Sequence, residues 1–156
     1  MASILDHCLH LPRTRLRKGE VVLRERERSD CLYVLTNGAI EVFRGDVTIV
    51  VIDGVGAVFG EMSVLLNLPH TASARAAADS SVCVIENARA FLHANPAVAL
   101  PIARILAQRL LNATSYLVDL KHQFEDRADH LGLVDEVLEA LSHEQSDSFV
   151  EPPPGP

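Results

Sequence analysis

Tryptophan is absent from this sequence, aromatic residues make up only 4% of its 156 residues, and no long uncharged run is present. The longest uncharged apolar run, residues 90–103, is only about fourteen residues long, and Pro96 and Pro101 interrupt it. A membrane-spanning helix needs about 20 apolar residues, so this run is too short. The N-terminus has no basic stretch followed by an apolar core, which argues against a secretory signal. We expect a cytoplasmic protein that has no membrane partner.

Cysteine is also scarce, with three widely spaced residues that fit neither a disulfide framework nor a CxxC site for metal or redox chemistry. Cys31 and Cys83 lie in apolar, strand-like runs and are expected to be reduced core residues. Cys8 stands between His7 and His10, but two histidines and a thiol without a fourth ligand are too few to predict a metal site. We expect no metal and no cofactor.

Basic charge is lacking at the C-terminal end. Residues 1–124 carry 13 Lys and Arg against 12 Asp and Glu, whereas residues 125–156 carry only Arg127 against nine acids. DNA and anionic membrane surfaces need a basic footprint, so we expect no direct nucleic-acid partner. The alternating arginines of residues 13–17 and 24–28 are typical of the solvent face of a strand.

The residues that are present predict a strand-rich first part and a helical second part. Short apolar segments separated by turn residues predict strands over residues 13–17, 21–23, 31–35, 39–43, 47–52, 73–77 and 81–85. Asn37-Gly38 between two of them is a strong hairpin signal. The fold class is therefore α+β: an antiparallel jelly-roll barrel with a short N-terminal helix and a long C-terminal helix.

The long helix is expected to begin at Pro96, with Asn95 as its cap. Beyond Pro101 its apolar residues recur at spacings of four and three, which is a heptad seam. This seam consists of Leu106, Leu110, Ala113, Leu117, Leu120 and Phe124. It packs either on the parent domain or against a second copy in a homodimer, and its length favours the homodimer.

Three regions follow from this organisation. Residues 1–125 form the globular domain with its long helix, and residues 126–145 form a short acidic amphipathic extension that Gly132 is expected to interrupt. Residues 146–156 are polar and proline-rich and are expected to be disordered.

The segment with the clearest chemistry, residues 59–77, reads FGEMSVLLNLPHTASARAA. A glycine and an acid open a short helix, and a proline followed by small residues leads into a strand. Backbone amides around Met62 and Ser63 at the helix start make a cradle for an anion. Glu61 beside them can accept hydrogen bonds from sugar hydroxyls. This arrangement suits a nucleotide whose phosphate and ribose lie side by side.

Over about residues 5–125 the sequence resembles the cyclic nucleotide-binding domain family, represented by the bacterial catabolite activator protein and the regulatory subunits of protein kinase A. The matching motifs occur in the family's order: Gly19-Glu20, Glu27 and Asp30 before Leu32-Tyr33, Gly38, Phe59-Gly60-Glu61, Pro69 to Ala76, and the long helix. The resemblance implies the jelly-roll fold and a phosphate-binding cassette for a cyclic nucleotide, cAMP or cGMP.

Within the cassette, the resemblance assigns Glu61 to the ribose 2′-hydroxyl, the backbone near Ser63 to the cyclic phosphate, and an arginine after Pro69 to the phosphate charge. This chain has His70 in place of that arginine. Arginine has a permanent charge and a planar fork, whereas histidine is mostly neutral near pH 7. Losing a charge-assisted contact costs on the order of 1.5–3 kcal/mol, or about one to two decades of affinity.

The family's long helix meets the base, so two of its hydroxyl residues join the predicted ligand-binding residues. These are Phe59, Gly60, Glu61, Met62, Ser63, His70, Thr71, Ala72, Thr114 and Ser115. Arg75 is a weaker alternative for the phosphate contact. The sequence also departs from the family at Arg26, which replaces a common turn glycine and leaves the pocket residues unchanged.

Two functions remain open. In the first, the chain is a non-catalytic regulatory module that binds a cyclic nucleotide, weakly or more tightly at lower pH, and couples binding to the position of the long helix. In the second, the pocket is degenerate and the chain is a ligand-independent protein-interaction or dimerisation module. Glu61 favours the first. An enzyme is not expected, because a nucleophile elbow, a Walker loop and a zinc-spaced histidine set are all missing.

Overall fold

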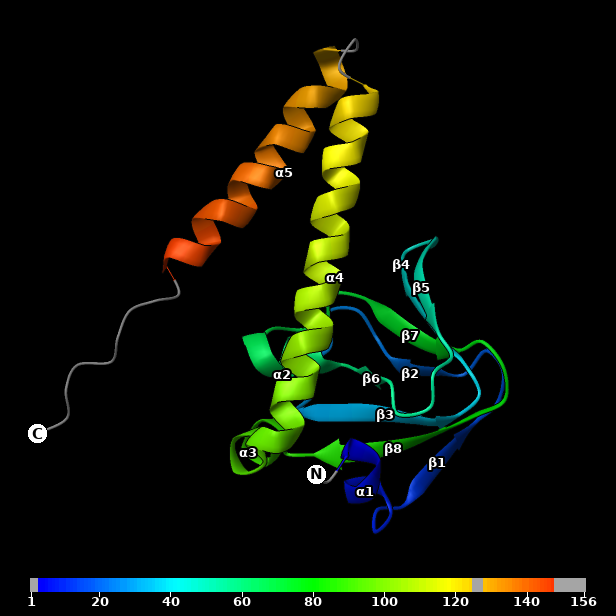
Figure 1. Cartoon of the computed structure of the whole chain (residues 1–156). Coiled ribbons are helices and arrows are strands. Elements are labelled where there is room, and N and C mark those ends of the chain that lie inside the picture. The colour runs from blue at the N-terminus through cyan, green and yellow to red at the C-terminus, as the bar shows by residue number, and fades with distance from the viewer. Residues whose placement is uncertain (1–2, 125–127, 148–156) are drawn as a thin grey trace, which may run out of the picture. The chain divides into compact units, whose positions relative to one another are not determined.

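The chain forms two compact units, residues 1–103 and 104–156, and the computed structural model describes residues 3–124 and 128–147 (Figure 1). Helix α4 (Pro96–Gln123) belongs to both units because it crosses the boundary between them. Of the predicted disordered tail, residues 148–156 lie outside the described residues. Residues 146–147 are helical, so the prediction of disorder is wrong for these two.

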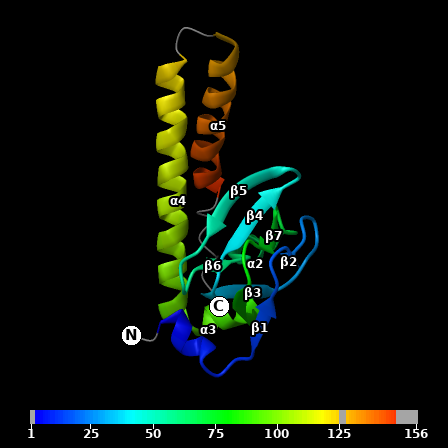
Figure 2. The same cartoon turned by 90° about the vertical axis from the view of Figure 1, so that its right-hand side faces the viewer.

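The first unit contains two antiparallel sheets of four strands each. The first sheet has the order β1 (Arg13–Leu16), β8 (Ser80–Glu86), β3 (Cys31–Asn37), β6 (Val58–Phe59). The second has the order β2 (Val21–Leu23), β7 (Ser73–Ala76), β4 (Ile40–Arg44), β5 (Val47–Ile52), and Figure 2 shows β4 and β5 as a long hairpin. The predicted antiparallel jelly roll is confirmed, and only the two-residue strand β6 was missed.

Side chains from both sheets meet in one hydrophobic core. The buried members of this core are Leu16, Leu23, Tyr33, Leu35, Ile40, Phe59, Ala74, Ala76 and Val82. Alternation along each strand turns one row of apolar side chains toward the opposite sheet, which is how two sheets pack face to face.

The β3–β4 turn needs a glycine, as the Asn37-Gly38 pair predicted. Gly38 has φ +91°, and a Cβ there would lie 2.2 Å from Ser80 Oγ. The same Ser80 hydroxyl accepts a hydrogen bond from the Ala39 amide at 3.0 Å, so it has no room to withdraw without losing this contact.

Short helices pack on the ends of the sheets. Helix α1 (Ile4–Cys8) is the predicted N-terminal helix, and it buries Cys8 beside Cys83. Burial and this second thiol raise the pKa of Cys8 to about 12, so the thiolate is strongly disfavoured. All three cysteines are reduced.

Helix α3 (Ala88–Ala94) precedes α4 and ends at Asn95. Asn95 occupies the predicted cap position directly before the long helix, and its carbonyl accepts from the Val98 amide at 2.9 Å. Its side-chain amide donates to the Phe91 carbonyl at 2.8 Å, so it also closes α3. The long helix begins at Pro96 as predicted, and Val98 and Ile102 in its first turns are buried.

The second unit consists of the remainder of α4 and of helix α5 (Ala128–Asp147). An ion pair between Lys121 and Asp135 joins the two helices. The expected interruption at Gly132 is wrong, because α5 continues through this residue. A single glycine lowers helix stability by only about 1 kcal/mol, so it does not have to end a helix.

Within the described ranges, no single helix combines the length and the apolar composition of a membrane span. Helices α3 and α4, which meet at a bend of 109°, are long and apolar enough only when they are taken together.

Candidate ligand-binding site

The cassette predicted from the sequence begins where β6 passes into helix α2 (Glu61–Leu66). Phe59 is buried and stacks on Tyr33, with ring centroids 5.2 Å apart. Gly60 follows with φ +80°, and a Cβ there would lie 3.1 Å from the Tyr33 ring and 3.2 Å from the Cys31 carbonyl oxygen. Only glycine combines this left-handed backbone with so close an approach, so Gly60 fixes the direction in which α2 leaves the sheet.

The first turn of α2 places its three predicted residues in different environments. The Glu61 side chain is buried, with the residue only 5% exposed. Ser63 is also buried, and its hydroxyl donates to the Gly60 carbonyl at 3.1 Å. Met62 lies between them in the sequence and is 48% exposed. The acid therefore faces the protein interior, while the methionine contributes to an open apolar surface.

His70 is held in the cassette through both its ring and its backbone. It is 6% exposed, and its ring Nε2 lies 2.8 Å from Ser29 Oγ. Its backbone N–H donates to the Glu27 carbonyl at 2.9 Å, and its carbonyl accepts from the Arg26 amide at 2.8 Å. Burial lowers the pKa of His70, and the charge of Glu27 opposes this effect only partly. The imidazole is therefore neutral near pH 7 and is hydrogen-bonded within the protein.

Thr71 and Ala72 lead from His70 into β7. Thr71 is exposed, and its carbonyl accepts a hydrogen bond from Arg44 Nε at 2.8 Å. Ala72 is half-buried. The two residues thus lie next to His70 along the chain, at the edge of the first unit, with the Thr71 backbone held by β4.

Arg75, the alternative phosphate residue, is occupied elsewhere. Its Nε lies 2.6 Å from a carboxylate oxygen of Glu41, and its guanidinium covers the Phe43 ring at 4.4 Å. Glu41 also accepts a hydrogen bond from the Thr48 hydroxyl at 2.6 Å. These two partners lower the pKa of Glu41, which keeps the carboxylate charged and paired with Arg75. This placement does not support a phosphate role for Arg75.

The register of the second sheet reveals an apolar wall that the sequence reasoning missed. Ile40 pairs with Ile52, and Val42 pairs with both Val50 and Ala74, so these side chains share the face that continues into the core. Exposure rises along this face, from 0% at Ile40 to 46% at Val50. The alternation in residues 40–52 was the available signal, because it places every second residue on one face.

The two predicted base contacts lie on the second unit. Thr114 is half-buried and Ser115 is exposed on α4. Their contact with a ligand stays a prediction.

Comparison with known proteins gives one family and several relatives. Residues 13–92 match the model of the family described as "Cyclic nucleotide-binding domain". The chain is 28% identical over 109 residues to a CRP-like cAMP-activated global transcriptional regulator of Mycobacterium tuberculosis, which covers 66% of this chain and 49% of that protein. It is 29% identical over 128 residues to a putative potassium channel protein of Rhodopseudomonas palustris, which covers 78% of this chain and 31% of that protein. The chain thus spans less than half the length of either relative.

A solved structure shows the same fold. The catabolite activator protein of Thermus thermophilus superposes with a TM-score of 0.61 at 25% identity, over 90% of this chain and 83% of that one.

Proposed function

This chain belongs to the cyclic nucleotide-binding domain family, and from this premise we propose that it is a non-catalytic regulatory module that binds cAMP or cGMP in the cassette of residues 59–72. One relative is named as a cAMP-activated regulator, which makes cAMP the first ligand to test.

The observation that carries the proposal is the turn from β6 into α2, where the left-handed Gly60 is followed directly by the acid Glu61 at the start of the short helix. A carboxylate at this position can accept hydrogen bonds from ribose hydroxyls, which are stronger when the acceptor is charged. Gly60 fixes the direction of the helix that carries this acid.

His70 supplies the phosphate contact in this proposal. Its Nε2 is engaged with Ser29 Oγ, so Nδ1 is the nitrogen that would face the ligand. A bound phosphate favours the imidazolium form, and binding therefore takes up a proton. Affinity accordingly increases as the pH falls from 8 to 6.

The apolar wall of the second sheet, with Val42, Val50 and Ile52, suits the flat faces of a purine. Thr114 and Ser115 on α4 would contact the edge of the base. Binding would then favour one position of α4, because only a ligand with different affinities for two helix positions shifts their populations.

Calorimetric titration with cAMP and cGMP at pH 6 and pH 8 tests the proposal. We expect micromolar or better binding that strengthens at pH 6.

The variant His70→Arg should bind at least tenfold more tightly, because it restores a permanent charge, and lose most of the pH dependence. Glu61→Gln should weaken binding at least tenfold, while Glu86→Gln, an exposed acid at the end of β8, should not change it. No heat with folded protein, or equal affinity of the Glu61→Gln variant, would overturn the proposal.

A second function is favoured by one observation, the internal hydrogen bond of His70. A phosphate position whose side chain is 6% exposed and already bonded to Ser29 fits a degenerate pocket. The chain would then be a ligand-independent protein-interaction or dimerisation module.

The heptad seam is the proposed homodimer surface in either case. Leu106, Leu117 and Leu120 are half-buried, whereas Leu110 is 42% exposed. A charge in the middle of such a seam disrupts helix pairing. We predict that Leu117→Glu gives a folded monomer by light scattering, whereas Asp119→Glu, an exposed neighbour, keeps the dimer. A wild-type protein that is monomeric at high concentration would contradict this interface.

A further inference from the structure

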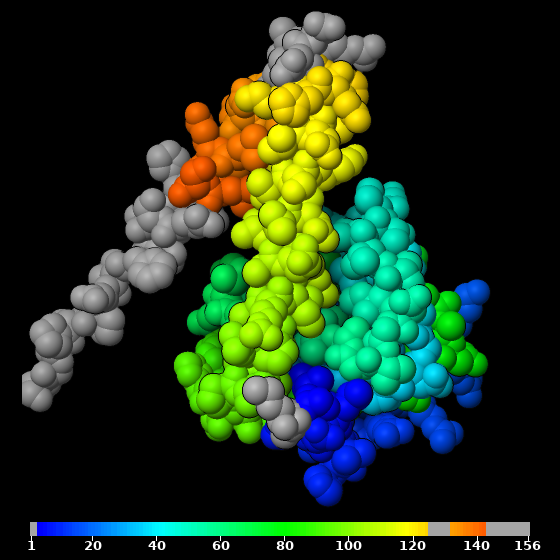
Figure 3. All heavy atoms as spheres, in the orientation of Figure 1, coloured from blue at the N-terminus to red at the C-terminus, as the bar shows by residue number. Residues whose placement is uncertain are grey.

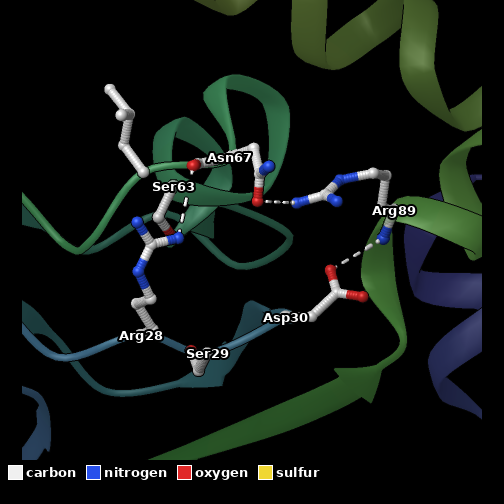
Figure 4. A pocket seen from close by; sticks show the side chains of 7 residues that line it. Arg28, Ser29, Asp30, Ser63, Asn67 and Arg89 are labelled. Atoms are coloured by element: carbon white, nitrogen blue, oxygen red, sulfur yellow. Dashed lines mark hydrogen bonds between the residues drawn. The ribbon is translucent and has the colours of Figure 1, made fainter.

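A cavity lies on the side of α2 that faces the β2–β3 connection and α3. It has a volume of about 350 Å³ and is lined by Arg28, Ser29, Asp30, Ser63, Asn67, Leu68 and Arg89 (Figure 4). The cavity contains two arginines and shares Ser63, Asn67 and Leu68 with the cassette, but Glu61 and His70 do not line it. We call it the arginine pocket.

The two guanidinium groups approach the C-terminal end of α2 from opposite sides of Asn67 (Figure 4). Arg89 donates to the Val64 carbonyl at 3.3 Å and to Asn67 Oδ1 at 2.8 Å. Arg28 donates to the Asn67 carbonyl through one weak bond of 3.4 Å. All these acceptors are neutral, so the contacts hold the arginines in place without pairing their charge with a carboxylate.

Most of the donor capacity of the two arginines remains for a ligand. A guanidinium carries five N–H donors, and the bonds above use two of them on Arg89 and one on Arg28. Among the residues that the structure describes, Asp30 is the one acid that lines the pocket, and its Oδ1 accepts from the Arg89 backbone amide at 3.0 Å. Within the described part of the chain, neither guanidinium forms an ion pair with a carboxylate.

We propose that the arginine pocket binds the phosphate group of a small phosphate monoester. Paired guanidinium forks match the geometry of phosphate oxygens, and the polar residues Ser29 and Ser63 line the same pocket. A volume of about 350 Å³ lies in the range of small-molecule pockets, about 300–1,000 Å³, which favours a small ester over a protein segment.

The pocket lies against the cassette, and two contacts connect them. Ser29 lines the pocket and also bonds the His70 ring, while Arg28 and Arg89 hold the end of α2. The arginine pocket shares Ser63, Asn67 and Leu68 with the cassette, but its two guanidinium groups lie outside residues 59–72. Variants of Arg28 and Arg89 therefore test phosphate binding separately from the cyclic nucleotide proposal, which Glu61 and His70 test.

NMR titration of the whole chain with inorganic phosphate and with glycerol phosphate, in about 0.1 M chloride, tests the proposal. We expect saturable shifts of the amides of Ser29, Asn67, Leu68 and Arg89, with a millimolar or lower Kd. Shifts centred on Thr71 and Ala72 would place the anion in the cassette and overturn the proposal.

Variants identify the charge that binds. Arg28→Gln should weaken phosphate binding at least tenfold and should fold normally, because it removes only one weak bond. Arg89→Lys keeps the charge but loses the fork, and should also weaken binding. Arg15→Gln, an exposed arginine of β1, is the matched control and should bind as the wild type does. Equal affinity of Arg28→Gln and wild type, or a phosphoserine peptide that binds while both small anions fail, would overturn the assignment.

Discussion

Strands β3 and β5 have similar apolar sequences but opposite environments. β3 lies between β8 and β6, and its Leu32, Val34 and Leu35 have no exposed surface. β5 is the edge strand of the second sheet, and its Val47 and Val51 are 67% and 51% exposed. Figure 3 shows the surface that this part of the chain forms. Apolar residues that stay on an edge contribute little to folding and are available for a ligand or a partner. One strand therefore holds the fold together, and the other offers a contact surface.

The largest expected effect tests this comparison with one substitution made in both strands. Val34→Ala should lower the free energy of unfolding by about 2–3 kcal/mol, because it removes buried methyl groups and leaves a cavity. Val51→Ala should cost less than about 1 kcal/mol, because the side chain is half exposed. Urea unfolding of both variants measures the difference. Equal losses would mean that β5 is covered in solution, for instance by a second copy of the chain.

The sequence predicted where the strands lie because two local signals agree along the chain. Apolar segments such as residues 47–52 alternate with turn residues such as Gly38, and both depend only on near neighbours. The exposure of β5 was not predictable in this way. An apolar strand is normally expected to be buried, and its edge position depends on which strands pair with it. The same limit explains why β6, with two residues, escaped detection.

In the cassette, too, local features were predictable from the sequence and long-range contacts were not. Gly60 and Glu61 were predicted because a glycine and an acid before an apolar helix form a local pattern. The bond between Ser29 and His70 joins residues 41 positions apart, and no periodicity encodes it. The pairing of Arg75 with Glu41 is equally distant, so a sequence argument could still assign this arginine to a phosphate. The arginine pocket was missed for the same reason, since Arg28 and Arg89 come from different ends of the domain.

A smaller effect concerns the connections between the two sheets, where Ser29 meets His70. Burial holds the pKa of His70 below its ordinary value of 6.5, so the unfolded chain binds more protons than the folded one. The stability that the neutral ring contributes is present above about pH 6.5 and is lost as the pH falls below it. We predict that the free energy of unfolding falls more steeply between pH 7.5 and pH 5.5 in wild type than in His70→Gln. Glutamine can keep a hydrogen bond to Ser29 and does not titrate.

The remaining histidines titrate in both proteins, so only the difference between the two curves reports on His70. Parallel curves would mean that the His70 ring is exposed to solvent in solution. The connection that carries His70 would then differ from the first sheet, whose core residues are buried.

The smallest expected effect is at Arg26, in the same connection. Its φ of 70° is in the left-handed region, which costs an L residue about 1–2 kcal/mol. Arg26→Gly removes this strain but adds the entropy of a glycine, about 0.5–1 kcal/mol, so the net stabilisation should be about 0.5–1 kcal/mol. The Arg26 amide still donates to the His70 carbonyl in the variant, because the bond uses only backbone atoms. Urea unfolding measures the gain, with Arg24→Gly as the control.

Arg24 is an exposed residue of the same connection without a positive φ, so glycine there should destabilise the chain. Equal losses in both variants would show that the connection relaxes away from the left-handed geometry in solution. A gain at Arg26 alone would show that this strain is present in the folded protein, next to the residue that takes the place of the family's phosphate arginine. The cAMP titration is then repeated with the Arg26→Gly variant. If the strained turn sets the position of the His70 ring, relieving the strain should change the affinity of the protein for cAMP.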